Sequence, residues 1–214
     1  SPGGQRPAAD RTGPGNPGLC PGDGAPAWAC HTDGHKYTNP KLVWAESYFI
    51  SKAVHNAFDN FWANKFGVQA AYRKMWRHIA EKFDGHPALF GYDVMNEPFL
   101  GSDGGKVFIQ LIANLAGTTI ADGRINKCKM IREVLTKGRA VHVLDQYKAD
   151  VFHKIVNKAA PLVNKFDREK YMPFLNSTAE EIREVSKDPI LFIENSYYSN
   201  LGIKCAVEPI TVNG

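Results

Sequence analysis

The order of helices and strands is the feature of this sequence that most limits its fold. Residues 71–83, AYRKMWRHIAEKF, carry large apolar side chains at helical spacing and lead through a short turn to the apolar run ALFGYDVMN at 88–96. Residues 177–185, STAEEIREV, open with a capping-box pattern and lead in the same way to PILFIEN at 189–195. Short apolar runs of this kind are typical of buried parallel strands. The repeated order of helix, turn and strand predicts an α/β fold with a parallel sheet.

Helical periodicity recurs in three other segments, near residues 51–62, 106–116 and 143–160. Only the two strands above are clear, with the remnant of a third expected near 27–30. A complete (β/α)8 TIM barrel needs roughly 250 residues, whereas this chain has 214. We therefore expect a partial (β/α)8 TIM barrel.

The first residues of the chain differ from the rest in composition. Gly and Pro dominate residues 1–26, and aliphatic side chains are almost missing from them. Such a segment cannot bury enough apolar surface to offset the entropy lost on ordering. We expect residues 1–26 to form a disordered arm and residues 27–214 to form the partial barrel domain.

Charge and patterning argue against several classes of protein. The net charge is +4, from 26 basic and 22 acidic residues, with no long block of one sign, so we expect no nucleic-acid partner. No apolar run reaches the length of about 18 residues that a membrane-spanning helix needs, and no signal peptide is visible. No glycine-rich phosphate loop follows a strand and no GxSxG occurs, which disfavours nucleotide use and a serine hydrolase.

The sequence does not indicate a metal or cofactor site. His31 and His35 flank Asp33, but Gly34 interrupts the segment and no helical pattern aligns the two imidazoles. The cysteines form no CxxC pair and leave two interpretations open, isolated buried thiols or one or two disulfides. There are four of them: Cys20, Cys30, Cys128 and Cys205.

The strand at 88–96 leads directly into Asn96-Glu97-Pro98. Chemistry in a parallel β/α unit sits at the carboxyl ends of the strands. Pro98 cannot donate a hydrogen bond to a sheet, so it helps to end the pairing there. Glu97 is therefore expected to project from a rigid strand end, which makes it the leading candidate for a catalytic acid.

The alternation of side chains along this strand assigns its two faces. Three residues share the face of Glu97, toward the barrel axis: Gly91, Asp93 and Met95. The large apolar residues should face the helices: Phe90, Tyr92 and Val94. Since four strand residues span about 13 Å, Asp93 is too far from Glu97 to be its direct partner. We expect Asp93 to be a buried structural acid.

Glu194 ends the second predicted strand. Glycoside hydrolysis uses two carboxyl groups, about 5–5.5 Å apart for retention of configuration and roughly 6.5–9.5 Å apart for inversion. Neighbouring strands lie about 4.8 Å apart, so a pair of Glu97 and Glu194 is geometrically allowed. We favour the other interpretation, in which Glu194 holds a neighbouring group or contacts substrate.

Aromatic residues near these strand ends are candidates for substrate binding. Tyr197 follows the second strand and belongs to the same face of the fold, where it would contact substrate. Trp28, in GDGAPAWAC, could stack on a sugar or cover a lipid tail, and packing within its loop is the alternative.

The stretch GYDVMNEPF resembles the acid/base motif of glycoside hydrolase family 5, in which Asn-Glu-Pro follows the fourth barrel strand. The likeness extends to YRKMWRHIAEKFDGHPALF before it and to LFIENSYYSNLGI further along, and these are similar to the endoglycoceramidase branch. It covers about residues 23–203. The resemblance implies that the chain spans roughly the third to fifth β/α units of the barrel.

The resemblance also implies roles for individual residues. Glu97 matches the general acid/base of the family, and Asn96 matches the residue that binds the sugar 2-hydroxyl. The nucleophile of the family is a second Glu in a context like Thr-Glu-Phe-Gly, which this sequence lacks, so we expect it beyond Gly214. The arm at 1–26 stands where a strand with a His-Gln-Asp-type motif is expected. We interpret it as a substitute that arose by altered splicing or a frame error.

The function implied is that of a retaining hydrolase that cleaves the β-glycosidic bond between oligosaccharide and ceramide in glycosphingolipids. Without its nucleophile, this chain is expected to be incomplete and weakly active or inactive. The resemblance implies no cofactor and an extracellular or lysosome-like location, and it leaves open peripheral contact with membrane lipid and the oligomeric state. Two alternatives remain, an endo-β-glucanase or mannanase acting on polysaccharide, and a non-catalytic glycolipid-binding or defective fragment.

Overall fold

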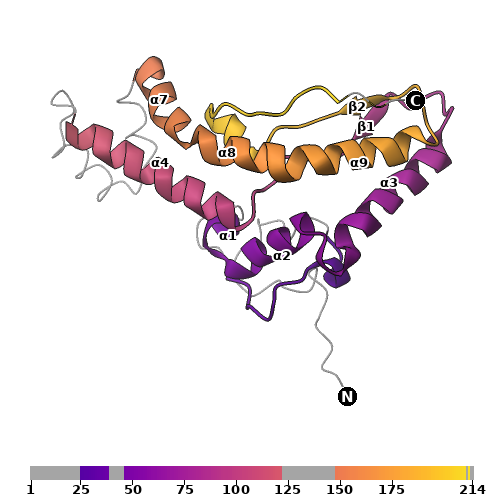
Figure 1. The fold of residues 1–214 in the computed structure, drawn as a ribbon, viewed down its shortest axis with the longest axis horizontal. Helices are drawn as coiled ribbons and strands as arrows, with labels where there is room; N and C mark the ends of the chain where they lie inside the picture. The colour runs from indigo at the N-terminus through magenta and orange to yellow at the C-terminus, as the bar shows by residue number, and fades with distance from the viewer. Residues whose placement is uncertain (1–24, 39–45, 122–147, 211, 213–214) are drawn as a thin grey trace, which may run out of the picture.

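A computed structural model describes residues 25–38, 46–121, 148–210 and 212 (Figure 1). The predicted arm lies almost wholly outside these residues. The α-helices and strands come in the following order: α1 (Ser47–Ile50), α2 (Lys52–Trp62), α3 (Val68–Phe83), β1 (Gly91–Asp93), α4 (Ser102–Ala121), α7 (Ala149–Val156), α8 (Ala160–Phe166), α9 (Met172–Arg183) and β2 (Ile190–Phe192). The chain also forms short 3-10 and π-helical segments: η2 (Ala27–Ala29), η4 (Lys65–Gly67), η5 (Asn157–Ala159), the π-helix η6 (Asp167–Tyr171) and η7 (Tyr197–Leu201).

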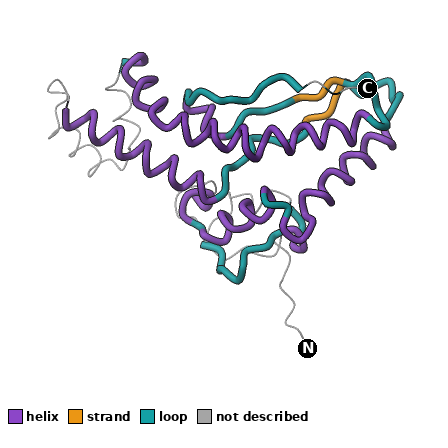
Figure 2. Tube along the Cα trace, in the orientation of Figure 1, coloured by secondary structure: helices purple, strands orange, loops and turns teal. Residues whose placement is uncertain are grey.

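The two strands pair in parallel, as the helix–turn–strand repeat predicts. Gly91 lies opposite Ile190, and Asp93 lies opposite Phe192. Both strands are shorter than the apolar runs at 88–96 and 189–195, because the described residues supply each strand with a single hydrogen-bonding neighbour. Figure 2 shows how short the pair is beside the helices.

Helices make up most of the described fold, and most of them match the predicted segments. α8, η6 and α9 follow one another as a long helical rod, against which α3 packs near one end and α4 near the other (Figure 1). α4 is longer than the predicted 106–116. The predicted segment 143–160 is described from residue 148 onward, where it forms α7 and η5 and reaches the first residue of α8.

The predicted start of α9 is wrong. The capping-box pattern placed it at Ser177, whereas the helix begins at Met172. Ser177 instead donates its hydroxyl to the Pro173 carbonyl at 2.9 Å, and Thr178 does the same to Phe174 at 2.8 Å. Such back-bonding within a helix satisfies these hydroxyls without a cap.

The exposure of individual side chains corrects some of the predictions for the first strand. Tyr92 and Val94 are buried against the helices, as predicted, but Phe90 is 71% exposed and meets Phe192 instead. Asp93 is exposed rather than buried, because no further strand of the described residues covers its face of the sheet. The strand remnant expected near 27–30 is the 3-10 turn η2.

Gly91 of β1 lies close against β2. A methyl group on its Cα would collide with the Ile190 carbonyl and with the Phe192 ring. Gly91→Ala is therefore expected to reduce the free energy of unfolding by about 1–3 kcal/mol. Urea denaturation followed by circular dichroism measures the change.

The matched control for this prediction is Gly117→Ala in α4. The added methyl there meets no atom within 4 Å, so the variant should be more stable by about 0.4–1 kcal/mol through reduced chain entropy. Equal stability of Gly91→Ala and wild type would mean that the two strands are not held at this distance.

An aromatic core fixes the loop that follows Glu97. Trp62 is 7% exposed, and its indole N–H donates to the Phe99 carbonyl at 2.8 Å. The Trp62 ring meets the rings of Phe166 and Phe174 edge to face, at centroid distances of 5.0 and 5.6 Å. Phe99 itself is 2% exposed. The chain just beyond Glu97 is thus anchored in the core.

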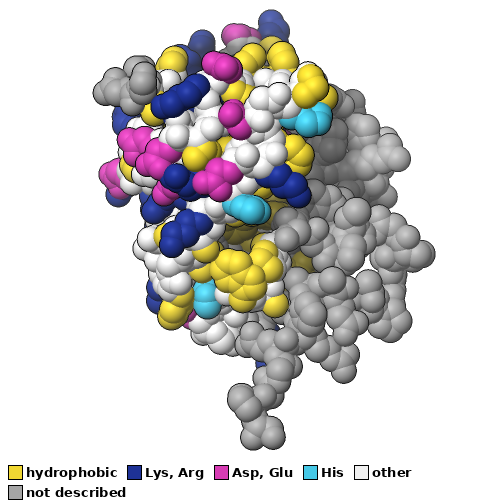
Figure 3. Space-filling view, turned by 90° about the vertical axis from the view of Figure 1, so that its right-hand side faces the viewer, with side chains coloured by type: hydrophobic (Ala, Val, Ile, Leu, Met, Phe, Trp, Pro, Cys, Tyr) yellow, Lys and Arg dark blue, Asp and Glu magenta, His cyan; other side chains and the backbone are white. Residues whose placement is uncertain are grey.

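The outer surface at the C-terminal end of α3 carries charges of both signs close together (Figure 3). Arg77 pairs with Glu81 at 3.1 Å, with Glu181 at 3.6 Å and with Glu184. These exposed pairs link α3 to the end of α9 and its C-cap, and each contributes little to stability. Among the helices that the structure describes, none combines the length and apolarity needed to cross a bilayer.

Candidate active site

The two strand-end glutamates come together. Glu97 lies four residues beyond β1, and Glu194 lies two residues beyond β2. The side-chain carboxylate of Glu194 accepts a hydrogen bond from the backbone N–H of Glu97, with an N–O distance of 2.8 Å. Parallel strands place their carboxyl ends at one edge, so this contact follows from the sheet topology.

Glu97 adopts an uncommon backbone conformation. Its φ is +40°, in the left-handed region, which costs a non-glycine residue roughly 1–2 kcal/mol. Its side chain is half-buried, and Oε1 accepts a hydrogen bond from the Asn200 amide at 2.5 Å. Glu97 is therefore held through both its backbone and its carboxylate.

Tyrosine hydroxyls fix the backbone beside both glutamates. Tyr72 of α3 donates to the Val94 carbonyl at 2.7 Å, and Tyr171 of η6 donates to the Glu194 carbonyl at 2.8 Å. Burial raises the pKa of both tyrosines above the ordinary value, so both hydroxyls keep the proton that they donate. The strand ends are therefore attached to the helices around them.

Asp93 forms a second carboxyl contact with Glu194. Although Asp93 is exposed, loss of water around its carboxyl group raises its pKa above the ordinary value of 3.8, and the negative charge of Glu194 and a hydrogen bond to it raise the pKa further. The backbone N–H of Met95 opposes the shift. Asp93 therefore keeps its proton to a higher pH than a free Asp and can donate it to Glu194.

The raised pKa of Asp93 predicts how stability depends on pH. The folded chain holds this proton at pH values where the unfolded chain has lost it. The stabilisation is therefore complete below the unfolded pKa, near 3.8, and is lost as the pH rises through the folded pKa. Asp93→Asn should remove this slope, which urea titrations at several pH values would measure.

Three other titratable groups interact with Asp93: Glu194, Tyr72 and Tyr171. Both tyrosines remain neutral through the acidic range, because burial raises the pKa of each above its ordinary value. Asp188→Asn, in the exposed turn before β2, is the matched control and should keep the wild-type slope. An unchanged slope in Asp93→Asn would assign the dependence to another carboxylate.

The structure brings together some of the predicted site residues. Asn96 is exposed beside Glu97 at the strand end. Tyr197 opens η7 and is half-buried against Phe49, at a centroid distance of 6.0 Å. Trp28 is 61% exposed on η2, and no hydrogen bond or ring contact between described residues joins it to Glu97. The substrate-binding roles of Asn96, Glu194, Tyr197 and Trp28 stay predictions, as does the catalytic role of Glu97.

Asn200 is the site residue that sequence reasoning missed. It lies in η7, and 103 positions separate it from Glu97 in the chain. No periodicity marks an asparagine in a short 3-10 helix as the partner of a strand-end acid. The one available signal was that its segment directly follows the second strand and so belongs to the same edge of the sheet.

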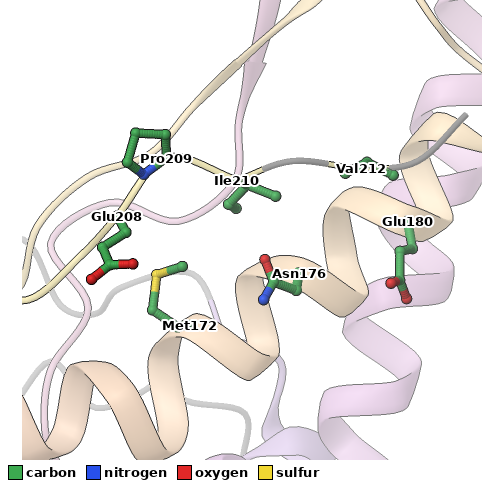
Figure 4. A pocket seen from close by; sticks show the side chains of 7 residues that line it. All are labelled: Met172, Asn176, Glu180, Glu208, Pro209, Ile210 and Val212. Atoms are coloured by element: carbon green, nitrogen blue, oxygen red, sulfur yellow. The ribbon is translucent and has the colours of Figure 1, made fainter.

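Two cavities lie away from the glutamates. One of about 360 Å³ separates α9 from the C-terminal segment (Figure 4). It is lined by Met172, Asn176, Glu180, Glu208, Pro209, Ile210 and Val212. A smaller one of about 220 Å³ lies between residues 30–34 and Phe66. Neither Glu97 nor Glu194 lines either of these two cavities.

Fold and site together define a class of protein. Parallel strands between helices, with a fixed glutamate at their carboxyl edge, are the arrangement of an α/β-barrel glycoside hydrolase. A profile of the cellulase family, glycosyl hydrolase family 5, matches residues 50–211, and the chain belongs to this family. The predicted resemblance and the partial barrel are thereby confirmed.

Two curated relatives share part of the sequence, and both are endoglycoceramidases. The protein from Hydra vulgaris is 30% identical over 101 residues, which cover 37% of this chain and 19% of the relative. The protein from Cyanea nozakii is 36% identical over 61 residues, which cover 28% of this chain and 12% of the relative. The chain thus spans about a fifth or less of these relatives.

A solved structure that the chain resembles is endo-glycoceramidase II from Rhodococcus sp. in complex with ganglioside GM3. The two have a TM-score of 0.48 and 25% sequence identity. The likeness covers 79% of this chain and 25% of that chain.

Proposed function

We propose that this chain supplies the general acid/base of a retaining glycoside hydrolase that cleaves glycosphingolipids between oligosaccharide and ceramide. The observation that carries the proposal is Glu97 itself, which is fixed at a strand end by Glu194 and Asn200. A general acid must be held within hydrogen-bond reach of the oxygen that it protonates. Family membership and the names of the curated relatives support the reaction and the substrate class.

Glu97 acts twice in the proposed reaction. In its protonated form it gives a proton to the ceramide oxygen as the glycosidic bond breaks, while a second carboxylate attacks the anomeric carbon. The ionised Glu97 then takes a proton from water, and this water releases the sugar from the second carboxylate. Asn96, beside Glu97, is proposed to bind the sugar 2-hydroxyl.

Glu194 is poorly placed to be the second carboxylate. Its Oε2 already accepts the backbone N–H of the acid, and Asp93 is hydrogen-bonded to its carboxyl group. A nucleophile needs a free oxygen aimed at the anomeric carbon. Glu194 is therefore not proposed as the nucleophile. Because the sequence also lacks a Glu in a Thr-Glu-Phe-Gly context, we propose that the nucleophile lies beyond Gly214 and expect this chain alone to be weakly active or inactive.

A fluorescent ganglioside assay tests the proposal on two proteins. One is this chain, and the other is a long form that contains it and extends to the length of the relatives. We expect the long form to release the oligosaccharide and the 214-residue chain to release little or none. No turnover by the long form would contradict the proposal.

The family description favours one second candidate, a polysaccharide hydrolase of the cellulase type. A ceramide-cleaving enzyme binds lipid as well as sugar. We propose that Trp28 stacks on the sugar or covers the lipid tail and that Tyr197 contacts the substrate. Ceramide analogues should therefore inhibit the long form more strongly than cello-oligosaccharides. The reverse order of inhibition would favour the polysaccharide hydrolase.

We also propose that the protein acts outside the cytosol, in an extracellular or lysosome-like compartment. The acceptor pattern Asn176-Ser177-Thr178 supports this, because the Asn176 side chain is exposed on α9. We expect the protein to be secreted and its electrophoretic mobility to change when N-linked glycans are removed. A protein confined to the cytosol would contradict the location.

A further inference from the structure

We infer that Glu194 and Asn200 are positioning residues for the acid/base, with Glu194 holding the backbone of Glu97 and Asn200 holding its carboxylate. This inference rests on the proposed function of Glu97. The sequence predicts that Glu194 contacts substrate. We infer instead that Glu194 contacts Glu97, the proposed catalytic residue.

The first part of the argument is the backbone of Glu97. A non-glycine residue stays in the left-handed region only where its surroundings hold it there. The N–H of Glu97 donates to the Glu194 carboxylate oxygen at 2.8 Å, which fixes the direction of this N–H. Tyr171 fixes the Glu194 backbone from the helical side. Glu194 thus connects the strained residue to a rigid element.

The second part is the side chain of Glu97. Asn200 lies in η7, next but one to Tyr198, which is fully buried and donates its hydroxyl to the Gly104 carbonyl at 2.5 Å. η7 is therefore attached to the start of α4. From this fixed position the Asn200 amide donates to Oε1 of Glu97. The carboxylate is oriented, and Oε2 is left for the proton that is transferred.

These contacts predict a specific kinetic effect. Misplacement of a reacting group by about 1 Å can lower the rate about 100-fold. Because Glu194 and Asn200 act through Glu97, their loss should lower kcat and leave KM nearly unchanged. A substrate-binding Glu194 would instead raise KM when it is removed.

Four substitutions in the long form test the positioning role. Glu194→Ala removes the acceptor, whereas Glu194→Gln keeps an acceptor oxygen. Asn200→Ala removes the donor, and Asn200→Asp puts a second carboxylate against Glu97. We expect kcat on the fluorescent ganglioside to fall about 10- to 100-fold in Glu194→Ala and Asn200→Ala and further in Asn200→Asp. Glu194→Gln should restore most of the rate.

Matched controls come from the same residue types at exposed positions. Glu184→Ala and Asn176→Ala lie on or beside α9, outside the strand-end site, and should keep wild-type kcat and KM. Because Asn176 is the proposed glycan acceptor, Asn176→Ala is compared with deglycosylated wild type. A rise in KM with unchanged kcat in Glu194→Ala would overturn the inference. Equal losses in Glu194→Ala and Glu194→Gln would overturn it as well, because the charge rather than the hydrogen bond would then matter.

A measurement without turnover separates this inference from the proposed function. In the 214-residue chain, hydrogen exchange of the Glu97 amide, followed by NMR, should be slow. Glu194→Ala should accelerate the exchange and Glu194→Gln should not. Unaltered exchange in Glu194→Ala contradicts the positioning role. An inactive long form with the expected exchange behaviour contradicts the proposed function alone.

Discussion

Glu97→Gln in the long form is expected to lower kcat on gangliosides by about 100- to 10,000-fold. A glutamine can neither protonate the departing ceramide oxygen nor accept a proton from water, so both steps slow down. The substitution preserves size and shape, and the new side chain can still accept a hydrogen bond from Asn200 through its amide oxygen. Initial rates with a fluorescent ganglioside measure the loss.

The matched control for this prediction is Glu184→Gln, which changes an exposed glutamate of the charged cluster around Arg77. It should retain the wild-type kcat. Circular dichroism must show equal folding of both variants. If Glu97→Gln turns over ganglioside at the wild-type rate, Glu97 is not the acid/base.

Trp62→Ala is expected to destabilise the chain by about 3–5 kcal/mol. The substitution removes a ring that packs against Phe166 and Phe174 in the core, and it leaves the Phe99 carbonyl without its donor. This loss is a large part of the roughly 5–15 kcal/mol that stabilises a typical domain. Urea denaturation measures the shift, and the loop after Glu97 should lose order first.

Two further variants divide this effect into its parts. Trp62→Phe keeps most of the ring but not the hydrogen bond, so it should cost about 1–3 kcal/mol for the unpaired Phe99 carbonyl. Trp28→Ala makes the same change as Trp62→Ala at a side chain that is 61% exposed and should cost less than about 0.5 kcal/mol. Equal losses at Trp28 and Trp62 would contradict the core position of Trp62.

The fold could be predicted where local pattern and burial agree. α3 and the strand after it follow from apolar spacing and a short turn, and the parallel pairing follows from their order. The start of α9 could not be predicted. A serine such as Ser177 can cap a helix, but it can also lie inside a helix when its hydroxyl donates to a preceding carbonyl, here that of Pro173. In the structure the π-helix Asp167–Tyr171 leads directly into α9, so Ser177 lies in the helix interior, and no pattern in the sequence marks that π-helix.

The candidate site could be predicted in part for a similar reason. Strand ends are visible in sequence, and the contact between Glu97 and Glu194 follows from them. The hydrogen bond from Asn200 depends on where η7 is anchored, through the burial of Tyr198. The exposure of Asp93 depends on strands that would cover its face, and the described residues include none. The alternation of side chains along a strand predicts which face of the sheet Asp93 occupies. It does not predict which other elements cover that face.

Rescue of Glu97→Ala by azide is the measurement that tests the central claim most directly. In a retaining enzyme without its acid/base, an aryl lactoside with a good leaving group still forms the glycosyl-enzyme, because its departure needs no proton. Azide can then attack where Glu97 would have activated water. The proposed role of Glu97 predicts that azide accelerates turnover of the Glu97→Ala long form and that NMR identifies the product as β-lactosyl azide. Lack of acceleration, or an α-lactosyl azide product, would contradict it.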